Sequence, residues 1–249
     1  MAYPPPMPEI LPIRAVHVDL VSPDDPELRP HLDGYRELLT PDELERMTRL
    51  IFERDRRRFL ITRAHVRTML SRYARVNPAD WRFMANVHGR PEILDRPAGV
   101  PDLRFNLSHT EGLIACAVTI GREVGVDVEY IGRRLTHDIA GRFFAAREVV
   151  DLKSLPVADQ ARVFFDYWTL KEAYIKARGF GLALPLGDFA FHLAPPAPVT
   201  ITFEPTMNDD PATWQFAQAW PTPQHRLGLA IRRIGPDLPV RIREVMPAA

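Results

Sequence analysis

The chain has 249 residues, of which 46% are hydrophobic and 26% charged, a composition typical of a globular protein with a sizeable core. Its 32 basic and 32 acidic residues cancel, which argues against a protein whose main role is to bind nucleic acid or an anionic membrane. A single cysteine, Cys116, excludes an internal disulfide, and without a membrane-spanning apolar run or a signal-peptide pattern we expect a cytoplasmic protein.

The first predicted elements form a strand followed by helices. Residues 1–12 contain five prolines and predict a flexible, Pro-rich arm. Residues 13–21 alternate in polarity and predict a strand. Thr40 and the proline after it predict the start of a helix. A longer amphipathic helix is predicted over residues 53–73, and its four arginines within positions 54–58 are either a solvated face or a place for an anion.

The rest of the chain alternates between β-rich segments and two further helices. Strands are predicted first at residues 81–87, 103–110, 113–120 and 124–131. Helices follow at residues 140–152 and about 158–178, and Gly179 ends the second of them. Four short strands with Pro-rich joints complete the prediction, at residues 188–193, 199–204, 213–220 and 226–232.

This order of strand, helices and strands occurs twice, which predicts an α+β fold built from two α+β halves that meet near Gly121. We place the N-terminal half at residues 13–120 and the C-terminal half at residues 121–249. The two halves share no close sequence repeat, so any symmetry between them would be structural only.

Four charged side chains are the first candidates for chemistry. Glu172 and Lys176 lie one turn apart on one face of the helix predicted at about residues 158–178, an arrangement that is usually a solvated ion pair. Asp127 and Glu129 lie on one face of a strand, where two carboxylates repel each other unless a base, a proton or a metal ion separates them. Three carboxylates brought together would suit Mg²⁺ or Mn²⁺. The sequence spacing does not show that Glu172 on the helix reaches Asp127 on the strand. The alternative to a metal site is that Asp127 and Glu129 form a polar face of the sheet.

Ser108 and His109 are adjacent on a predicted strand and would point to opposite sides, which disfavours a hydrolase dyad. Each could instead donate a hydrogen bond to an anion at the end of the strand. For His109 the alternative is a structural histidine.

Four blocks of the sequence resemble the 4'-phosphopantetheinyl transferases. They are FNLSHT, GVDVEYI, RFFAAREVVDL and WTLKEAYIKARGFGLALPL, at residues 105–110, 125–131, 142–152 and 168–186. The length and organisation look like the Sfp type, whose single chain is a pseudo-dimer of two similar α+β halves with the active site in the cleft between them. The resemblance covers residues 38–191, with two departures: Arg90 stands where many members have Lys, and Ala145 where Ser or Thr is frequent.

The resemblance implies Mg²⁺-dependent transfer of the 4'-phosphopantetheine arm of coenzyme A to a serine of an apo acyl, peptidyl or aryl carrier protein, with release of 3',5'-ADP. Such a reaction activates fatty acid, polyketide or nonribosomal peptide synthesis. The implied metal ligands are Asp127, Glu129 and Glu172, and the implied catalytic residues are Glu172, as a base, and Lys176, which stabilises phosphate. The implied CoA-binding residues are Arg54, Arg90, Ser108, His109 and Lys176.

Two other function classes fit the same residues. A CoA-binding sensor would keep the pocket without catalysis, and a metal-dependent phosphoesterase would cleave pyrophosphates with water. We expect a monomer, because two halves in one chain suffice to build the site. For carrier docking we expect the helix after Thr40 and the loop at residues 131–143.

Overall fold

The computed structural model describes residues 13–132, 139–181 and 184–247, so the predicted arm at residues 1–12 lies outside the described residues. Helices and strands are mixed, as expected for an α+β fold. The first elements are β1 (Val16–Val21), α1 (Leu32–Glu37), α2 (Pro41–Thr48), α3 (Glu53–Ser71), β2 (Phe83–Ala85), β3 (Pro91–Ile93), β4 (Leu103–Thr110) and β5 (Leu113–Ile120). Thr40 caps α2 as predicted, since its hydroxyl accepts the N–H of Glu43 while the Glu43 carboxylate accepts the N–H of Thr40.

The later elements are β6 (Val124–Tyr130), α4 (Ile139–Phe143), α5 (Ala146–Ser154), α6 (Val157–Arg178), β7 (Phe189–His192), β8 (Thr200–Phe203), β9 (Trp214–Thr222), β10 (His225–Arg232) and β11 (Val240–Glu244). The helix predicted at residues 140–152 is two helices, because the backbone is extended at Ala145. Ala145 has no side-chain acceptor for the first turn of α5. The carboxylate of Glu148 instead accepts the N–H of Ala145 at 2.9 Å.

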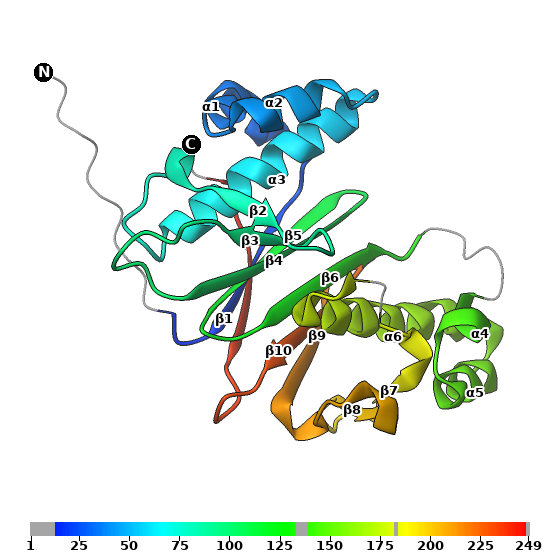
Figure 1. The fold of residues 1–249 in the computed structure, drawn as a ribbon. Coiled ribbons are helices and arrows are strands. Elements are labelled where there is room, and N and C mark those ends of the chain that lie inside the picture. The colour runs from blue at the N-terminus through cyan, green and yellow to red at the C-terminus, as the bar shows by residue number, and fades with distance from the viewer. Residues whose placement is uncertain (1–12, 133–138, 182–183, 248–249) are drawn as a thin grey trace, which may run out of the picture.

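The main strands form two sheets, ordered β11-β1-β5-β4 and β6-β10-β9 (Figure 1). In each sheet the first strand of a half, β1 or β6, pairs antiparallel with the second strand of a hairpin, β5 or β10. This shared order supports the prediction of two similar halves. The boundary at residue 120 stays a prediction, and β11, at the end of the chain, pairs parallel with β1 in the first sheet.

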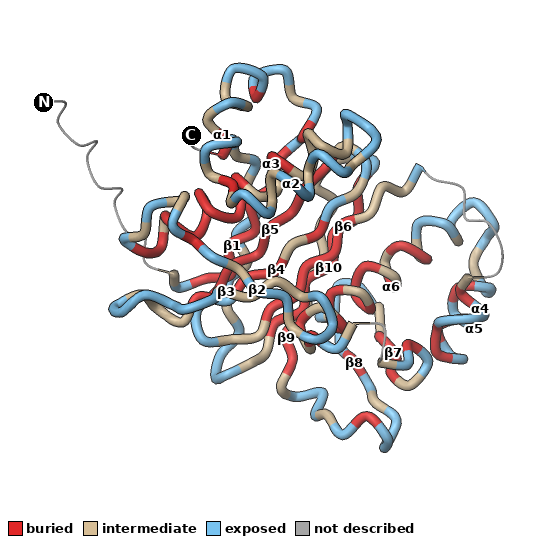
Figure 2. The backbone as a smooth tube through the Cα atoms, turned by 45° about the horizontal axis from the view of Figure 1, so that its top comes forward, coloured by how far each residue is buried: buried red, intermediate tan, exposed pale blue. Residues whose placement is uncertain are grey.

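The two sheets share one hydrophobic core, to which alternate residues of β1, β5, β6 and β10 contribute. Helix α3 packs on the other side of the first sheet, and α6 packs against β6 and β10 of the second. Figure 2 shows the buried residues gathered along these central strands and along the inner side of α6. No helix in the described parts of the chain is long and apolar enough to cross a membrane.

Side chains of β4 bridge the two sheets by binding the backbone of β6. Three alternate residues of β4 take part, because residues two apart face the same side of a strand. The N–H groups of Val126, Val128 and Tyr130 donate to Asn106 Oδ1 at 2.9 Å, Ser108 Oγ at 3.2 Å and Thr110 Oγ1 at 3.1 Å. The FNLSHT block therefore holds the edges of the two sheets together.

Candidate active site

Two glycines let α6 lie directly against the second sheet. A Cβ atom at Gly125 of β6 would lie 2.0 Å from the carbonyl oxygen of Ala173, and one at Gly228 of β10 would lie 2.5 Å from the backbone of Thr169. No other residue type fits such a close approach. The helix face that carries Trp168, Glu172 and Lys176 is thereby brought to the side of β6 that carries Asp127 and Glu129.

Lys176, Asp127 and Ser108 form a hydrogen-bonded cluster between helix and sheet. The Lys176 ammonium donates to Asp127 Oδ1 at 2.6 Å and to Ser108 Oγ at 3.0 Å. The Ser108 hydroxyl in turn donates to Asp127 Oδ1 at 2.9 Å. The side chain of Asp127 is only 6% exposed and that of Lys176 is 28% exposed. Ser108 is thus fully engaged by its neighbours.

Glu172 and Glu129 share this environment. The pKa of Glu172 is raised to about 7, mainly by burial and then by the negative charge of Asp127; Lys176 opposes this rise, and Glu129 adds a smaller one. Glu129 accepts a hydrogen bond from the indole N–H of Trp168 at 3.1 Å. The structure therefore brings together the two carboxylate groups that the spacing alone left unconnected.

The chemistry of these donors fits a hard divalent cation, although the side chains do not converge on a point. Three carboxylates from β6 and α6 supply only oxygen ligands, which Mg²⁺ and Mn²⁺ prefer. Asp127 Oδ2 is buried and has no hydrogen-bond partner. Among the described residues, no three His, Cys, Asp or Glu side chains lie close enough to enclose an ion, and Lys176 neutralises Asp127 instead.

Ser108 and His109 point to opposite sides of β4, as predicted. His109 lines a separate pocket of about 380 Å³ whose wall includes three arginines: Arg46, Arg58 and Arg63. Loss of water around the ring lowers the pKa of His109, and the positive charges of Arg58 and Lys176 lower it further. An anion in this pocket would offset those charges and favour the protonated ring.

Arg54 is not among the residues that line the arginine-lined pocket. Its side chain is 80% exposed and packs over the ring of Phe52. It lines a smaller hollow of about 150 Å³ together with Arg58 and Thr110. Arg58, which lines both hollows, is the more central residue. The sequence placed it among the four arginines that could receive an anion but not among the CoA-binding residues, and Arg46 and Arg63 were not identified. Helical spacing was the available signal, since Asp55, Arg58 and Thr62 share one face of α3 and all line the larger pocket.

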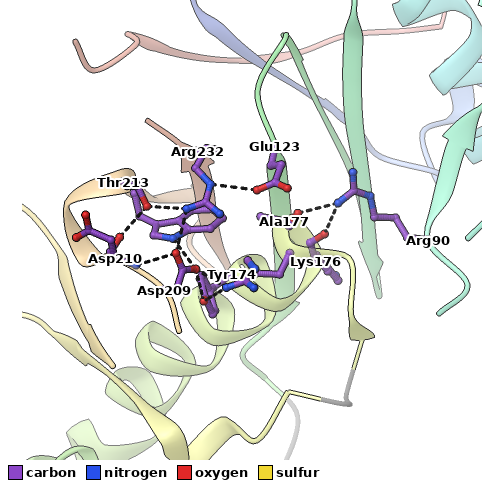
Figure 3. Close-up of polar contacts among 11 residues, drawn as sticks. Arg90, Glu123, Tyr174, Lys176, Ala177, Asp209, Asp210, Thr213 and Arg232 are labelled. Carbon is purple, nitrogen blue, oxygen red and sulfur yellow. Dashed lines mark hydrogen bonds and ion pairs between the residues drawn. The ribbon is translucent and has the colours of Figure 1, made fainter. Parts of the chain in front are cut away.

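Arg90, predicted to bind CoA, contacts the protein backbone. Its guanidinium donates to the carbonyl oxygens of Lys176 and Ala177, at the end of α6 (Figure 3). Its side chain is 13% exposed. The guanidinium of Arg90 therefore lies against the backbone of the helix turn that carries Lys176.

A buried ion pair fixes which way α6 faces, and the sequence reasoning did not identify it. Lys171 and Glu148 are both fully buried, with 2.8 Å between the ammonium and the carboxylate. Lys171 also donates to the carbonyl oxygens of Leu186 and Phe189, while Glu148 accepts the N–H of Phe191. Since Lys171 points into the core of the C-terminal half, the next residue, Glu172, faces β6.

Comparison with known proteins gives consistent matches along the chain. Residues 123–230 match the 4'-phosphopantetheinyl transferase superfamily, and residues 27–120 match the N-terminal part of a 4'-phosphopantetheinyl transferase. The chain is 39% identical over 193 residues to the 4'-phosphopantetheinyl transferase HetI of Nostoc sp., covering 76% of this chain and 79% of HetI. It is 31% identical over 178 residues to the 4'-phosphopantetheinyl transferase Sfp of Bacillus subtilis, covering 72% of this chain and 77% of Sfp.

Among solved structures, a holo-[acyl-carrier-protein] synthase of Thermotoga maritima is 19% identical and covers 44% of this chain and 62% of its own, with a TM-score of 0.36.

Proposed function

Because the chain belongs to the 4'-phosphopantetheinyl transferase family, of the Sfp type, we propose that it transfers the 4'-phosphopantetheine arm of coenzyme A to a serine of an apo carrier protein and releases 3',5'-ADP. The observation that carries the proposal is the meeting of Asp127, Glu129, Glu172 and Lys176 between β6 and α6. Beside it, Arg58 and His109 line a cationic pocket suited to the phosphates of CoA.

The side chains around this cluster divide the work of a phosphoryl transfer. Ser108 is held by Asp127 and Lys176, so the incoming carrier serine supplies the nucleophile. Glu172, whose pKa of about 7 suits a general base near neutral pH, takes the proton of that serine directly or through a water molecule. Lys176 binds the phosphate and stabilises the departing 3',5'-ADP.

Asp127, Glu129 and Glu172 would hold a divalent cation, Mg²⁺ or Mn²⁺, which when bound neutralises charge on the pyrophosphate. Two features of the chain support this assignment. Asp127 Oδ2 is buried without a hydrogen-bond partner, and the neighbouring carboxylates raise the pKa of Glu172. A cation beside these groups would relieve both costs.

The carrier is an apo acyl, peptidyl or aryl carrier protein, and the enzyme acts as a monomer. One chain supplies the cluster on β6 and α6 as well as the arginine-lined pocket on α3 and β4. Of the two surfaces predicted for docking, α2 is described, whereas the loop at residues 131–143 lies partly outside the described residues.

The test is to incubate the protein with CoA, Mg²⁺ and each of a panel of apo carriers from fatty acid, polyketide and nonribosomal peptide synthesis. Mass spectrometry should show the phosphopantetheine mass gain on at least one carrier, with none when a chelator is added. A reaction without carrier is the control for a phosphoesterase, which would break down CoA on its own. If every carrier stays unmodified with metal present, the proposal is wrong.

A further inference from the structure

The turn between β2 and β3 contacts the last turn of α6. Arg90 Nη1 donates to the carbonyl oxygen of Lys176 at 3.1 Å and to that of Ala177 at 2.7 Å. Asn86 Nδ2 donates to the carbonyl oxygen of Gly179 at 3.1 Å. Figure 3 shows Arg90 reaching to the helix backbone. Two side chains of one turn therefore bind three backbone carbonyls at the end of the helix that carries Glu172 and Lys176.

The turn is built to present these two side chains. Asn86 Oδ1 accepts the N–H groups of His88 at 2.9 Å and Arg90 at 3.0 Å, and the N–H of Asn86 donates to the carbonyl oxygen of Arg90 at 2.9 Å. Gly89, at a φ of 84°, supplies the left-handed residue that the reversal needs. The donors on Arg90 and Asn86 are thus held in place before any ligand binds.

The end of α6 leaves room for them. Gly179 ends the helix at a φ of 70°, and a Cβ atom there would lie 3.1 Å from Arg90 Nη1 and 3.4 Å from Asn86 Nδ2. The last carbonyls of a helix have no partner within the helix and carry its negative dipole end, so a guanidinium on them is favourable. The carbonyl of Lys176, the residue that meets Asp127, is one of the groups held.

The same helix turn is also held from the side of the 208–210 loop, which Figure 3 shows opposite Arg90. Asp209 accepts hydrogen bonds from Tyr174 Oη at 2.8 Å, Trp214 Nε1 at 3.0 Å and Arg232 Nη1 at 3.0 Å, and it pairs with Arg178. Because this network is independent of Arg90, the helix should stay formed when Arg90 is removed. Arg90 would then determine how firmly the last helical turn, which carries Lys176, is held in position.

We propose that Arg90, assisted by Asn86, is a positioning residue that holds the last turn of α6 so that the Lys176 ammonium stays over Asp127. The inference rests on the proposed transferase function. Pro91, the next residue of the turn, lines the arginine-lined pocket. The β2–β3 hairpin therefore joins the wall of that pocket to the helix end that carries Lys176.

The experiment compares Arg90→Ala, Arg90→Lys and Asn86→Ala with the matched control Arg96→Ala. Arg96 lies just after β3 and pairs with Asp102 at 3.1 Å. Steady-state transfer to an apo carrier gives kcat and KM, calorimetry gives the Kd for CoA, and hydrogen exchange by mass spectrometry reports on the backbone at residues 176–180.

For Arg90→Ala we expect kcat to fall by about tenfold or more, while KM and Kd for CoA rise less than in Lys176→Ala, because Lys176 is displaced but not removed. Exchange at residues 176–180 should become faster in parallel. Arg90→Lys should recover part of kcat, since a single ammonium can still reach one carbonyl. Asn86→Ala removes one hydrogen bond to the helix end and two within the turn, so it should lower kcat by at least roughly threefold, and Arg96→Ala should change nothing.

A weaker affinity of Arg90→Ala for CoA with unchanged kcat and unchanged exchange would show that Arg90 is a CoA ligand and overturn the inference. Unchanged kinetics in all variants would overturn it as well. Failure of the wild-type protein to modify any carrier would instead overturn the proposed function, while exchange and calorimetry would still report whether Arg90 holds the helix end.

Discussion

The ammonium of Lys176 lies 2.6 Å from a carboxylate oxygen of Asp127, with Ser108 hydrogen-bonded to both side chains. A basic residue on the helix and an acidic residue on the strand thus neutralise each other where Glu129 and Glu172 also gather. In the proposed reaction Asp127 would hold the cation together with the other carboxylates, and Lys176, kept beside it, would bind the phosphate.

Replacing Glu172 by Gln should stabilise the metal-free protein and slow the reaction. The pKa of Glu172 is raised from 4.5 to about 7, so ionisation of this group costs folding free energy, and the cost is complete above pH 7. At pH 8 in chelator we expect the free energy of unfolding of Glu172→Gln to exceed that of the wild type by about 1 to 3 kcal/mol. Urea unfolding measures this difference.

The same variant should respond less to metal. Mg²⁺ should raise the Tm of the wild type at pH 8 and leave that of Glu172→Gln nearly unchanged. Lys176→Ala is the contrasting variant, because it removes the phosphate-binding charge and should raise KM for CoA as well as lower kcat. Equal losses of rate and of CoA affinity in both variants would contradict the roles assigned to these residues.

Ser108→Ala and Asn106→Ala separate the structural role of β4 from its role in the cluster. Each removes the acceptor for one N–H of β6 and should lower the free energy of unfolding by about 1 to 3 kcal/mol, the cost of an unpaired buried donor. Only Ser108 also contacts Asp127 and Lys176. At a temperature where both variants are folded, the transfer rate should therefore drop in Ser108→Ala alone, and a similar drop in Asn106→Ala would argue against a special role for Ser108.

Arg58→Ala should weaken CoA binding more than Arg54→Ala. Arg58 lines both hollows beside β4, whereas Arg54 is 80% exposed. Loss of a charge-assisted hydrogen bond costs about 1.5 to 3 kcal/mol, which corresponds to a rise in Kd of roughly 10- to 100-fold. Calorimetry with CoA and 3'-dephospho-CoA tests whether the 3'-phosphate is the group bound, since Arg58→Ala should then bind the two nearly equally. A larger loss in Arg54→Ala would reverse this assignment.

His65 should make the protein sensitive to mild acid. Its ring is 1% exposed, neither nitrogen has a hydrogen-bond partner, and burial followed by the charge of Arg243 lowers its pKa from 6.5 to about 4. Between pH 6.5 and pH 4, the unfolded chain therefore binds a proton at His65 and the folded chain does not. The free energy of unfolding falls as the pH drops through this range. The loss amounts to roughly 2 to 3 kcal/mol.

Urea unfolding at several pH values checks this prediction. His65→Leu should lose less stability between pH 7 and pH 4.5 than the wild type, whereas His88→Ala, at the exposed hairpin turn, should follow the wild type. The same pH dependence in His65→Leu and wild type would show that other groups cause the acid sensitivity.

Patterns within a single element allowed much of this arrangement to be predicted. The strands at residues 103–110 and 113–120 and the helix ending at Gly179 agree with their periodicity and end signals. The pairing of Asp127 and Glu129 on one face of β6 follows from strand alternation. These features depend on neighbouring residues only, which is why a sequence reveals them.

Features that depend on distant segments were not predictable in this way. The parallel pairing of β11 with β1 joins the two ends of the chain, and the buried pair of Lys171 and Glu148 links two helices. Arg90 has the positive charge expected of a CoA ligand, and the sequence does not show that the turn at residues 86–90 directs its guanidinium to the backbone of α6. Likewise, which arginine of α3 enters the pocket depends on how that helix packs on its sheet.

The central claim, direct transfer of phosphopantetheine to a carrier, is tested most directly by counting products. Wild-type protein, CoA, Mg²⁺ and an apo carrier should yield one 3',5'-ADP for each carrier that gains the phosphopantetheine mass, and Asp127→Asn should reduce both products together. Release of 3',5'-ADP from CoA without any modified carrier, at a rate that the carrier does not change, would contradict the account.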